Sequence, residues 1–286
     1  MQLFSNILID GIVYGMVLFI ISVGLSVTMG LMRFINLAHG AFAMAGGYVA
    51  AWLVREEGYP FLAALVLAVL AAVVLAALLE TFVFRFLYKR TELEQVLFTI
   101  GFTFAAIALA TLLAGPYIQL IPLPEWLDGS MSLGDRTLPT QRVFVIVMGL
   151  VVVLLLWLII AKTRFGIWLR ASVDNAPMSS SLGINIRLVQ CATFAFGAGL
   201  AALGGALGAE LMPLEPYYPL KYLVLMLVVV SVGGLGSVSG TLVAALVLGV
   251  IDTAGRYLAS DFGTFFFYVA MILLLAWRPE GILRRH

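Results

Sequence analysis

The sequence predicts an all-α polytopic transmembrane helical bundle, from its composition, its apolar segments and the placement of its basic residues. Of 286 residues, 63% are hydrophobic and only 11% are charged, and the mean hydropathy is +1.11. Soluble proteins carry about a quarter charged residues, so this chain lacks the polar side chains that a water-exposed surface needs. A bilayer covers an apolar exterior instead. We expect one transmembrane domain over residues 1–286.

Nine apolar segments are long enough to consider, since a membrane-crossing helix needs roughly 20 mainly apolar residues. The long candidates lie near 7–30, 61–84, 95–115, 142–161 and 188–209, a Gly/Ala-rich one covers 36–54, and shorter ones lie near 221–233, 240–255 and 263–277. The first run follows no basic region and is too long for a signal peptide, so we interpret it as a retained span. This predicts about 8–9 membrane segments, some of which could be broken or re-entrant.

The basic residues predict an orientation, because cytoplasmic loops are enriched in lysine and arginine. With the N-terminus outside and every segment crossing, 11 of the 16 basic residues fall inside and 5 outside. The inside set is Arg33, Arg85, Lys89, Arg90, Lys162, Arg164, Arg170, Arg187, Arg278, Arg284 and Arg285. The opposite orientation reverses the split, so we expect an outer N-terminus and a cytoplasmic C-terminus.

The expected outer loops are acidic or aromatic, as in the stretch with Glu210 and Glu215. The longest is the external loop 116–141, which contains Pro116, Pro122, Pro124 and Pro139. A long irregular connection is either a partner-binding loop or a solvated connector, and both interpretations remain open.

One expected inner segment, 162–187, is too polar to span the membrane and too patterned for disorder. Asp174 and Asn175 can hydrogen-bond the backbone and start a helical turn. Pro177 suits the first turn, where its missing N–H is not needed, and Gly183 suits a helix stop. The pattern predicts a short amphipathic helix over about 174–182, which either anchors in lipid headgroups or docks a partner.

Four sequence elements resemble permease subunits of ABC importers in the branched-chain amino acid family. The 162–187 segment carries Phe165–Gly166, Arg170–Ala171 and Leu182–Gly183–Ile184, like the family's FG, RA and LGI elements. The other matches are a Gly-Leu…N-x-A-H-G element with Gly30, Leu31, Asn36, Ala38, His39, Gly40, Gly46 and Gly47, a Gly-rich stretch at 232–249, and the ending AWRPEGI at 276–282.

The resemblance implies that 162–187 is a coupling segment that docks on an ATPase, with Arg170, Asp174, Asn175, Leu182, Gly183 and Ile184 as the ATPase-coupling residues. It implies a multi-pass protein of the bacterial inner membrane. Its partners would be a homologous second permease subunit in a heterodimer, two ABC ATPase subunits and a periplasmic binding protein. The solute would be a branched-chain or other hydrophobic amino acid, although related permeases take urea, amides or aromatic acids. ATP would be used by the partner subunits, and this chain would bind no cofactor.

Polar and glycine-rich positions within the apolar segments are candidates for the translocation pathway and its gating. The first group is Asn36, His39 and Gly40, in which a helix would place Asn36 and His39 on one face. His39 has no second histidine, cysteine or carboxylate pair nearby, so we expect packing or gating rather than metal binding. The second group is Gly233, Gly234, Gly236, Ser237 and Gly240, which forms either a broken helix along the pathway or a tight turn at the inner surface.

The remaining features limit the class of function. The phosphate-binding pattern G-x-x-x-x-G-K-[ST] is absent, so the chain is expected to have no ATPase site of its own, and no catalytic set is evident. A net charge of +1 suggests no nucleic-acid partner, and a lone Cys191 allows no intrachain disulfide.

The isolated acids Asp10, Glu80 and Asp252 either line a path for a charged solute or pair with neighbours. An ion-coupled secondary transporter is the alternative function, and an intramembrane enzyme is a third.

The sequence also contains two G-x-x-x-G pairs, Gly11 with Gly15 and Gly204 with Gly208. Such pairs let helices approach closely. They serve either packing within the chain or contact with a second permease.

Overall fold

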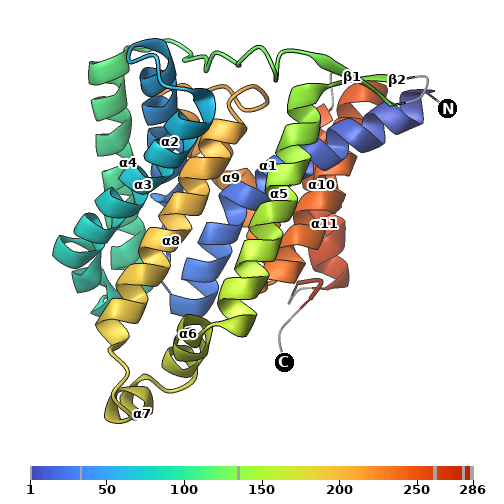
Figure 1. Cartoon of the computed structure of the whole chain (residues 1–286). Coiled ribbons are helices and arrows are strands. Elements are labelled where there is room, and N and C mark those ends of the chain that lie inside the picture. The colour runs from blue at the N-terminus through green and yellow to red at the C-terminus, as the bar shows by residue number, and fades with distance from the viewer. Residues whose placement is uncertain (1, 33, 134–135, 260–262, 279–280, 284–286) are drawn as a thin grey trace.

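A computed structural model describes residues 2–32, 34–133, 136–259, 263–278 and 281–283. Each predicted apolar segment contains one helix (Figure 1). These helices are α1 (Gln2–Met32), α2 (His39–Arg55), α3 (Phe61–Phe82), α4 (Glu92–Ala114), α5 (Thr140–Trp157), α8 (Ile186–Leu207), α9 (Tyr218–Gly233), α10 (Val238–Leu258) and α11 (Gly263–Trp277). The predicted helical bundle is therefore confirmed.

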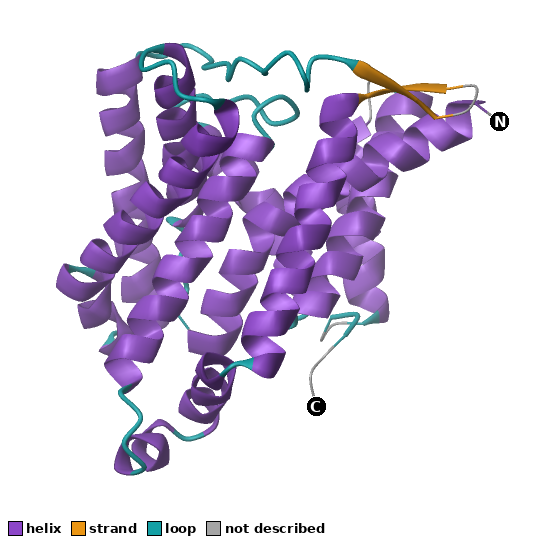
Figure 2. Ribbon diagram, viewed as in Figure 1, coloured by secondary structure: helices purple, strands orange, loops and turns teal. Residues whose placement is uncertain are grey.

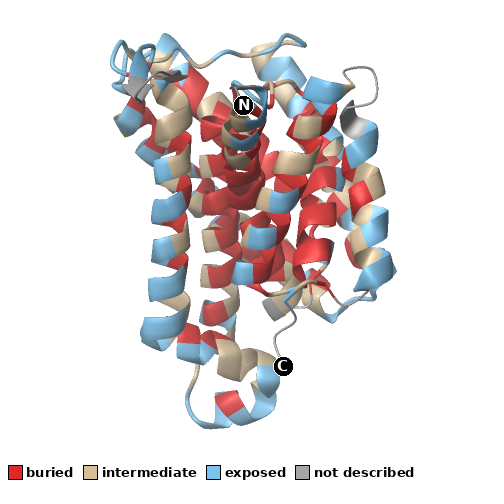
Figure 3. Ribbon diagram, turned by 90° about the vertical axis from the view of Figure 1, so that its right-hand side faces the viewer, coloured by how far each residue is buried: buried red, intermediate tan, exposed pale blue. Residues whose placement is uncertain are grey.

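Six stretches within the described residues are long and apolar enough to cross a membrane. They comprise most of α1, all of α3, α4, α8 and α10, and α5 extended to Lys162. The most apolar window of α1 is 78% buried, whereas those of α3, α4 and α5 are 17–28% buried. A helix that is apolar all round yet largely uncovered by protein requires lipid around it. The chain is thus a multi-pass membrane protein in which α1 is central and α3, α4 and α5 are peripheral. Figure 3 shows buried residues gathered in the middle of the bundle and exposed ones on its outer faces.

Small residues allow α1 to approach its neighbours α8 and α10 at backbone distance. A Cβ atom at Gly24 would lie 2.3 Å from the carbonyl oxygen of Gly197 in α8. Gly11 and Gly15 meet α10 in the same way, and Gly204 and Gly208 meet α1. Both predicted G-x-x-x-G pairs therefore serve packing within the chain.

The loop 116–141 is not wholly irregular, so the all-α prediction was incomplete. It contains an antiparallel hairpin of β1 (Ser130–Leu133) and β2 (Arg136–Pro139), drawn in orange in Figure 2. Gln119 ties the loop down, because its N–H donates to the carbonyl of Leu214 at 2.8 Å and its Oε1 accepts from Arg55 at 2.9 Å. We call this side of the molecule the hairpin end.

Four short helices complete the fold. They are the 3-10 helix η1 (Phe84–Lys89), the π-helix η2 (Leu158–Lys162), α6 (Arg164–Asp174) and α7 (Ala176–Ser181). Helices α6 and α7 lie opposite the hairpin, at what we call the α7 end (Figure 1).

Candidate functional site

The segment between η2 and α8 forms two short helices rather than one. The predicted helix is confirmed as α7, which begins where Asn175 Oδ1 accepts the N–H of Met178 at 3.0 Å. Pro177 occupies its first turn, and Gly183 follows its end with φ +86°. The preceding helix α6 was not predicted. Thr163 caps it by accepting the N–H of Gly166 at 3.4 Å.

Arg170 contacts the backbone of its own chain. Its Nη1 donates to the carbonyl oxygen of Ile160, which lies in η2. Gly166 allows α6 to lie this close to η2, since a Cβ atom at Gly166 would lie 2.1 Å from the same carbonyl oxygen. The π-helix disturbs the regular backbone pairing at the end of α5, and Arg170 supplies a donor to it. Arg170 therefore fastens α6 to the end of α5.

The tip formed by α7 and Leu182–Ile184 projects from the bundle with apolar side chains exposed. Met178 and Leu182 are 58% and 72% exposed, and Asp174, Asn175 and Gly183 are exposed as well. The N–H of Ile184 closes the turn by donating to the backbone carbonyl of Ser179 at 3.1 Å. Exposed apolar side chains beyond the membrane-crossing helices are typical of a protein contact.

Replacing Arg170 by methionine is expected to loosen α6 without unfolding the bundle. A hydrogen bond from a charged donor contributes about 1.5–3 kcal/mol, less here because Arg170 is only half-buried. We expect amide hydrogen exchange to rise several-fold in α6 and to stay unchanged in α10. Arg187→Met, at an exposed arginine for which the described residues provide no partner, is the matched control. Equal exchange in α6 of both variants would contradict the role given to Arg170.

Residues 34–38, between α1 and α2, are not helical, so the prediction that Asn36 and His39 share a helical face was wrong. Helix α2 begins only at His39. Asn36 bonds the backbone itself, through Oδ1 to the N–H of Ala38 at 3.1 Å, and such bonds compete with a helix. Two side chains of the neighbouring α4 supply hydrogen-bond partners to this non-helical backbone. Gln95 Oε1 accepts from the N–H of Ile35 at 3.1 Å, and Thr103 donates to the carbonyl of Leu37 at 3.5 Å.

His39 lies well inside the bundle. It is 1% exposed, and its Nε2 is 3.0 Å from the carbonyl oxygen of Ile21 in α1. Ile21 precedes the end of α1 by three turns, or about 16 Å. Segment 34–38 therefore runs back alongside the last turns of α1 before α2 starts. Non-helical backbone at membrane depth is tolerated only inside protein or beside a water-filled cavity, and here side chains of α4 supply its hydrogen-bond partners. We call residues 34–40 the α1–α2 break.

The second glycine group forms a tight turn, which is one of its two predicted alternatives. Gly234 and Gly236 adopt φ values of +93° and +78° between α9 and α10. Ser237 caps α10 by accepting the N–H of Gly240 at 3.1 Å. The turn packs against the last residues of α1, since a Cβ atom at Gly30 would lie 2.1 Å from the nitrogen of Gly236.

Two further contacts fix this region. Gly40 packs on the start of α9, because a Cβ atom there would lie 2.9 Å from the Cα of Pro219. The N–H of Ile282 donates to the carbonyl of Val232 at 2.8 Å, which fastens the family-like C-terminal motif to the end of α9. The predicted pathway residues are thus split between the α1–α2 break and a turn that both contact α1.

The three isolated acids are each paired with an arginine. Glu80 accepts from Arg85 at 2.8 Å, Asp252 accepts from Arg256 at 2.7 Å, and Asp10 pairs with Arg142. The hydrogen bond to Glu80 raises the pKa of the Arg85 guanidinium, which lies in η1. Of the two predicted alternatives, the structure therefore places these acids in neighbour pairs.

The comparisons with known proteins agree with this architecture. Residues 7–275 match the family described as branched-chain amino acid transport system / permease component. The chain belongs to this family. It is 26% identical to the high-affinity branched-chain amino acid transport system permease protein LivH of Escherichia coli K12, over 99% of this chain and 96% of that one. It is 29% identical to the probable branched-chain amino acid transport permease protein LivH of Methanocaldococcus jannaschii, over 96% and 91%.

A second permease of the same named system is also similar. The E. coli permease protein LivM is 28% identical over 94% of this chain and 68% of its own length. No solved structure shows significant similarity to the chain. Family membership makes the chain a permease component. The structure adds an exposed apolar tip at α7 and a non-helical connection before α2.

Proposed function

We propose that this chain is the permease subunit of an ABC importer and forms half of a translocation pathway for branched-chain or related hydrophobic amino acids. Separate ATPase subunits would drive it, and a periplasmic binding protein would supply the solute. The observation that carries this proposal is the α7 tip, which leaves Met178 and Leu182 exposed beyond the membrane-crossing helices of a permease-family chain.

The contacts around the tip support a mechanical role. α7 is joined to α6 by Ser179, whose hydroxyl donates to the carbonyl of Ala171 at 2.8 Å. α6 is joined through Arg170 to η2, which directly continues α5. On the other side Asn185 caps α8, accepting the N–H of Leu188 at 3.1 Å. A displacement of α7 by closing ATPases would therefore reach α5 and α8 together, and α8 packs on α1, α2 and α3.

The proposal includes the topology. The hairpin end would face the periplasm and the α7 end the cytoplasm of a bacterial inner membrane, with the N-terminus outside, the C-terminus inside and eight or nine membrane segments. A second, homologous permease would complete the pathway, and similarity to both LivH and LivM supports a heterodimer.

The gating elements would be the two features that contact α1. They are the α1–α2 break with Asn36, His39 and Gly40, and the turn with Gly233, Gly234, Gly236, Ser237 and Gly240. Both would change their packing on α1 as α5 and α8 move, because α1 also packs against these two helices.

Reconstitution in proteoliposomes tests this function. The full complex with ATPases and binding protein is expected to take up leucine only with ATP, and the permeases alone are expected to take up none. Leucine uptake by the permeases alone, driven by an ion gradient, would support the secondary transporter instead.

A further inference from the structure

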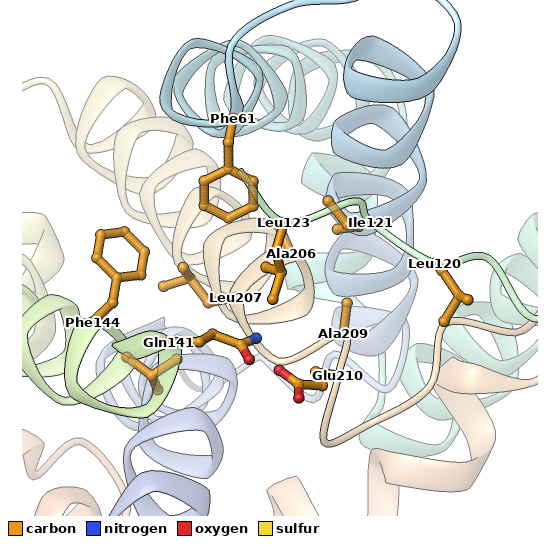
Figure 4. Close-up of a pocket in the computed structure, with 11 residues that line it drawn as sticks. Phe61, Leu120, Ile121, Leu123, Gln141, Phe144, Ala206, Leu207, Ala209 and Glu210 are labelled. Carbon is orange, nitrogen blue, oxygen red and sulfur yellow. The ribbon is translucent and has the colours of Figure 1, made fainter. Parts of the chain in front are cut away.

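A small cavity of about 100 Å³ lies at the hairpin end between α3, α5 and α8 (Figure 4). The rings of Phe61 in α3 and Phe144 in α5 pack edge to face, with centroids 6.2 Å apart, and together form one of its walls. Leu207 at the end of α8 and Leu123 from the overlying loop complete its apolar walls. A cavity of this volume has room for several water-sized groups, which is the size of a branched aliphatic side chain.

Two polar side chains close one side of this cavity. Gln141 and Glu210 lie next to one another in Figure 4, and both line the cavity. Among the described residues nothing donates a hydrogen bond to Glu210 or pairs with its charge. The contrast is Glu215 on the same connection, whose carboxylate forms an ion pair with Lys221. Glu210 therefore has its whole hydrogen-bonding capacity available at the edge of an apolar cavity.

The connection that carries Glu210 is held in place. Met212 and Leu214 are fully buried, and the N–H of Met212 donates to the carbonyl of Gly208 at 2.7 Å. The loop that roofs the cavity is tied to the same connection, through the N–H of Gln119 and the carbonyl of Leu214. The carboxylate is thus presented by fixed backbone rather than by a free loop.

We propose that this cavity binds an aliphatic amino acid, with the side chain against the wall formed by Phe61 and Phe144 and the ammonium group on Glu210. The Gln141 amide N–H would donate to the carboxylate of the solute. A carboxylate and an amide beside apolar walls complement a zwitterion with an aliphatic tail. The nearest cation along α5, Arg142, is already paired with Asp10, so the cavity itself carries one free negative charge. The inference rests on the proposed function and adds a solute site on the permease itself.

Thiol protection tests this site without requiring transport. Leu123→Cys is introduced together with Cys191→Ala, which removes the only native cysteine, and the reconstituted complex is labelled with a membrane-impermeant maleimide. Saturating leucine is expected to slow labelling at least about fivefold. Isoamylamine, which keeps the ammonium group, is expected to protect at higher concentration, and 4-methylpentanoate, which lacks it, is expected not to protect. Equal protection by leucine and 4-methylpentanoate, or none by leucine, would overturn the proposal.

Two matched variants assign the effect to the carboxylate. Glu210→Gln is expected to abolish protection by leucine, whereas Glu215→Gln, on the same connection but outside the cavity, is expected to keep it. Protection that survives in Glu210→Gln would overturn the role of Glu210. The labelling assay and the uptake assay test the two proposals separately. Protection without ATP-driven uptake would support the site and contradict the proposed importer. Uptake without protection would support the importer and contradict the site.

Discussion

Gly205→Leu is expected to prevent the chain from reaching its folded state. A Cβ atom at Gly205 in α8 would lie 2.0 Å from the carbonyl oxygen of Ala43 in α2. That neighbour is backbone inside a buried helix, so it can give way only if α2 and α8 move apart. Overpacking usually costs about 1–3 kcal/mol and occasionally more, and at a helix–helix backbone contact we expect the upper end. The measurement is the fraction of monodisperse protein, and its melting temperature, after purification in mild detergent.

Gly101→Leu is the matched control for this variant. Gly101 lies within α4, and a Cβ atom there would meet nothing within 4 Å. Leucine also favours the helix over glycine by about 0.8 kcal/mol. We expect this variant to melt at or slightly above the wild-type temperature. Equal yields and melting temperatures for the two variants would show that the close packing of α2 on α8 is not required.

Leu182→Asp is expected to uncouple the ATPases from the permease while leaving the permease folded. Leu182 is 72% exposed, so its replacement removes no packing within the chain. If the tip docks in an apolar cleft, a buried carboxylate there costs a few kcal/mol, or about 30- to 100-fold in affinity. The measurement is leucine-stimulated ATP hydrolysis in the reconstituted complex, which we expect to fall to the basal rate.

Leu182→Met keeps the apolar contact and is expected to retain most of the stimulation. The melting temperature of the Leu182→Asp permease should equal that of the wild type, which separates loss of docking from loss of fold. Asp174→Asn, at the exposed end of α6, and Gly183→Ala, in the tip, are expected to reduce the stimulation as well. Wild-type stimulation in all of these variants would show that the tip is not the coupling element.

The helices were predictable because the bilayer imposes long apolar segments, and each of these contains a helix in the structure. α6 was missed because its sequence, with Arg164, Arg170 and Asp174, is as polar as a loop. Its cap at Thr163 and the arginine contact to η2 are tertiary features. The hairpin was missed for a similar reason, since two strands of four residues give too short an alternation to stand out within a proline-containing loop.

The candidate site was predictable as a set of segments but not as a geometry. Family motifs indicated the tip, yet only the structure shows that Arg170 faces inward and Leu182 outward. Spacing placed Asn36 and His39 on one helical face. In the structure Asn36 bonds the backbone N–H of Ala38 instead, and α2 begins only at His39. Glu210 and Glu215 look equivalent in the sequence, and the difference between them depends on where Lys221 lies in space.

The non-helical segment between α1 and α2 has a consequence for biosynthesis. The backbone of Ile35 finds its partner in Gln95, 60 residues later in the chain, and that of Leu37 finds Thr103. When the first two segments leave the ribosome, these polar groups have no partner and cannot remain in the hydrocarbon core. We expect the second segment to stay near the membrane surface, or inside the translocon, until α4 has been made. Insertion of this protein is then cooperative rather than one helix at a time.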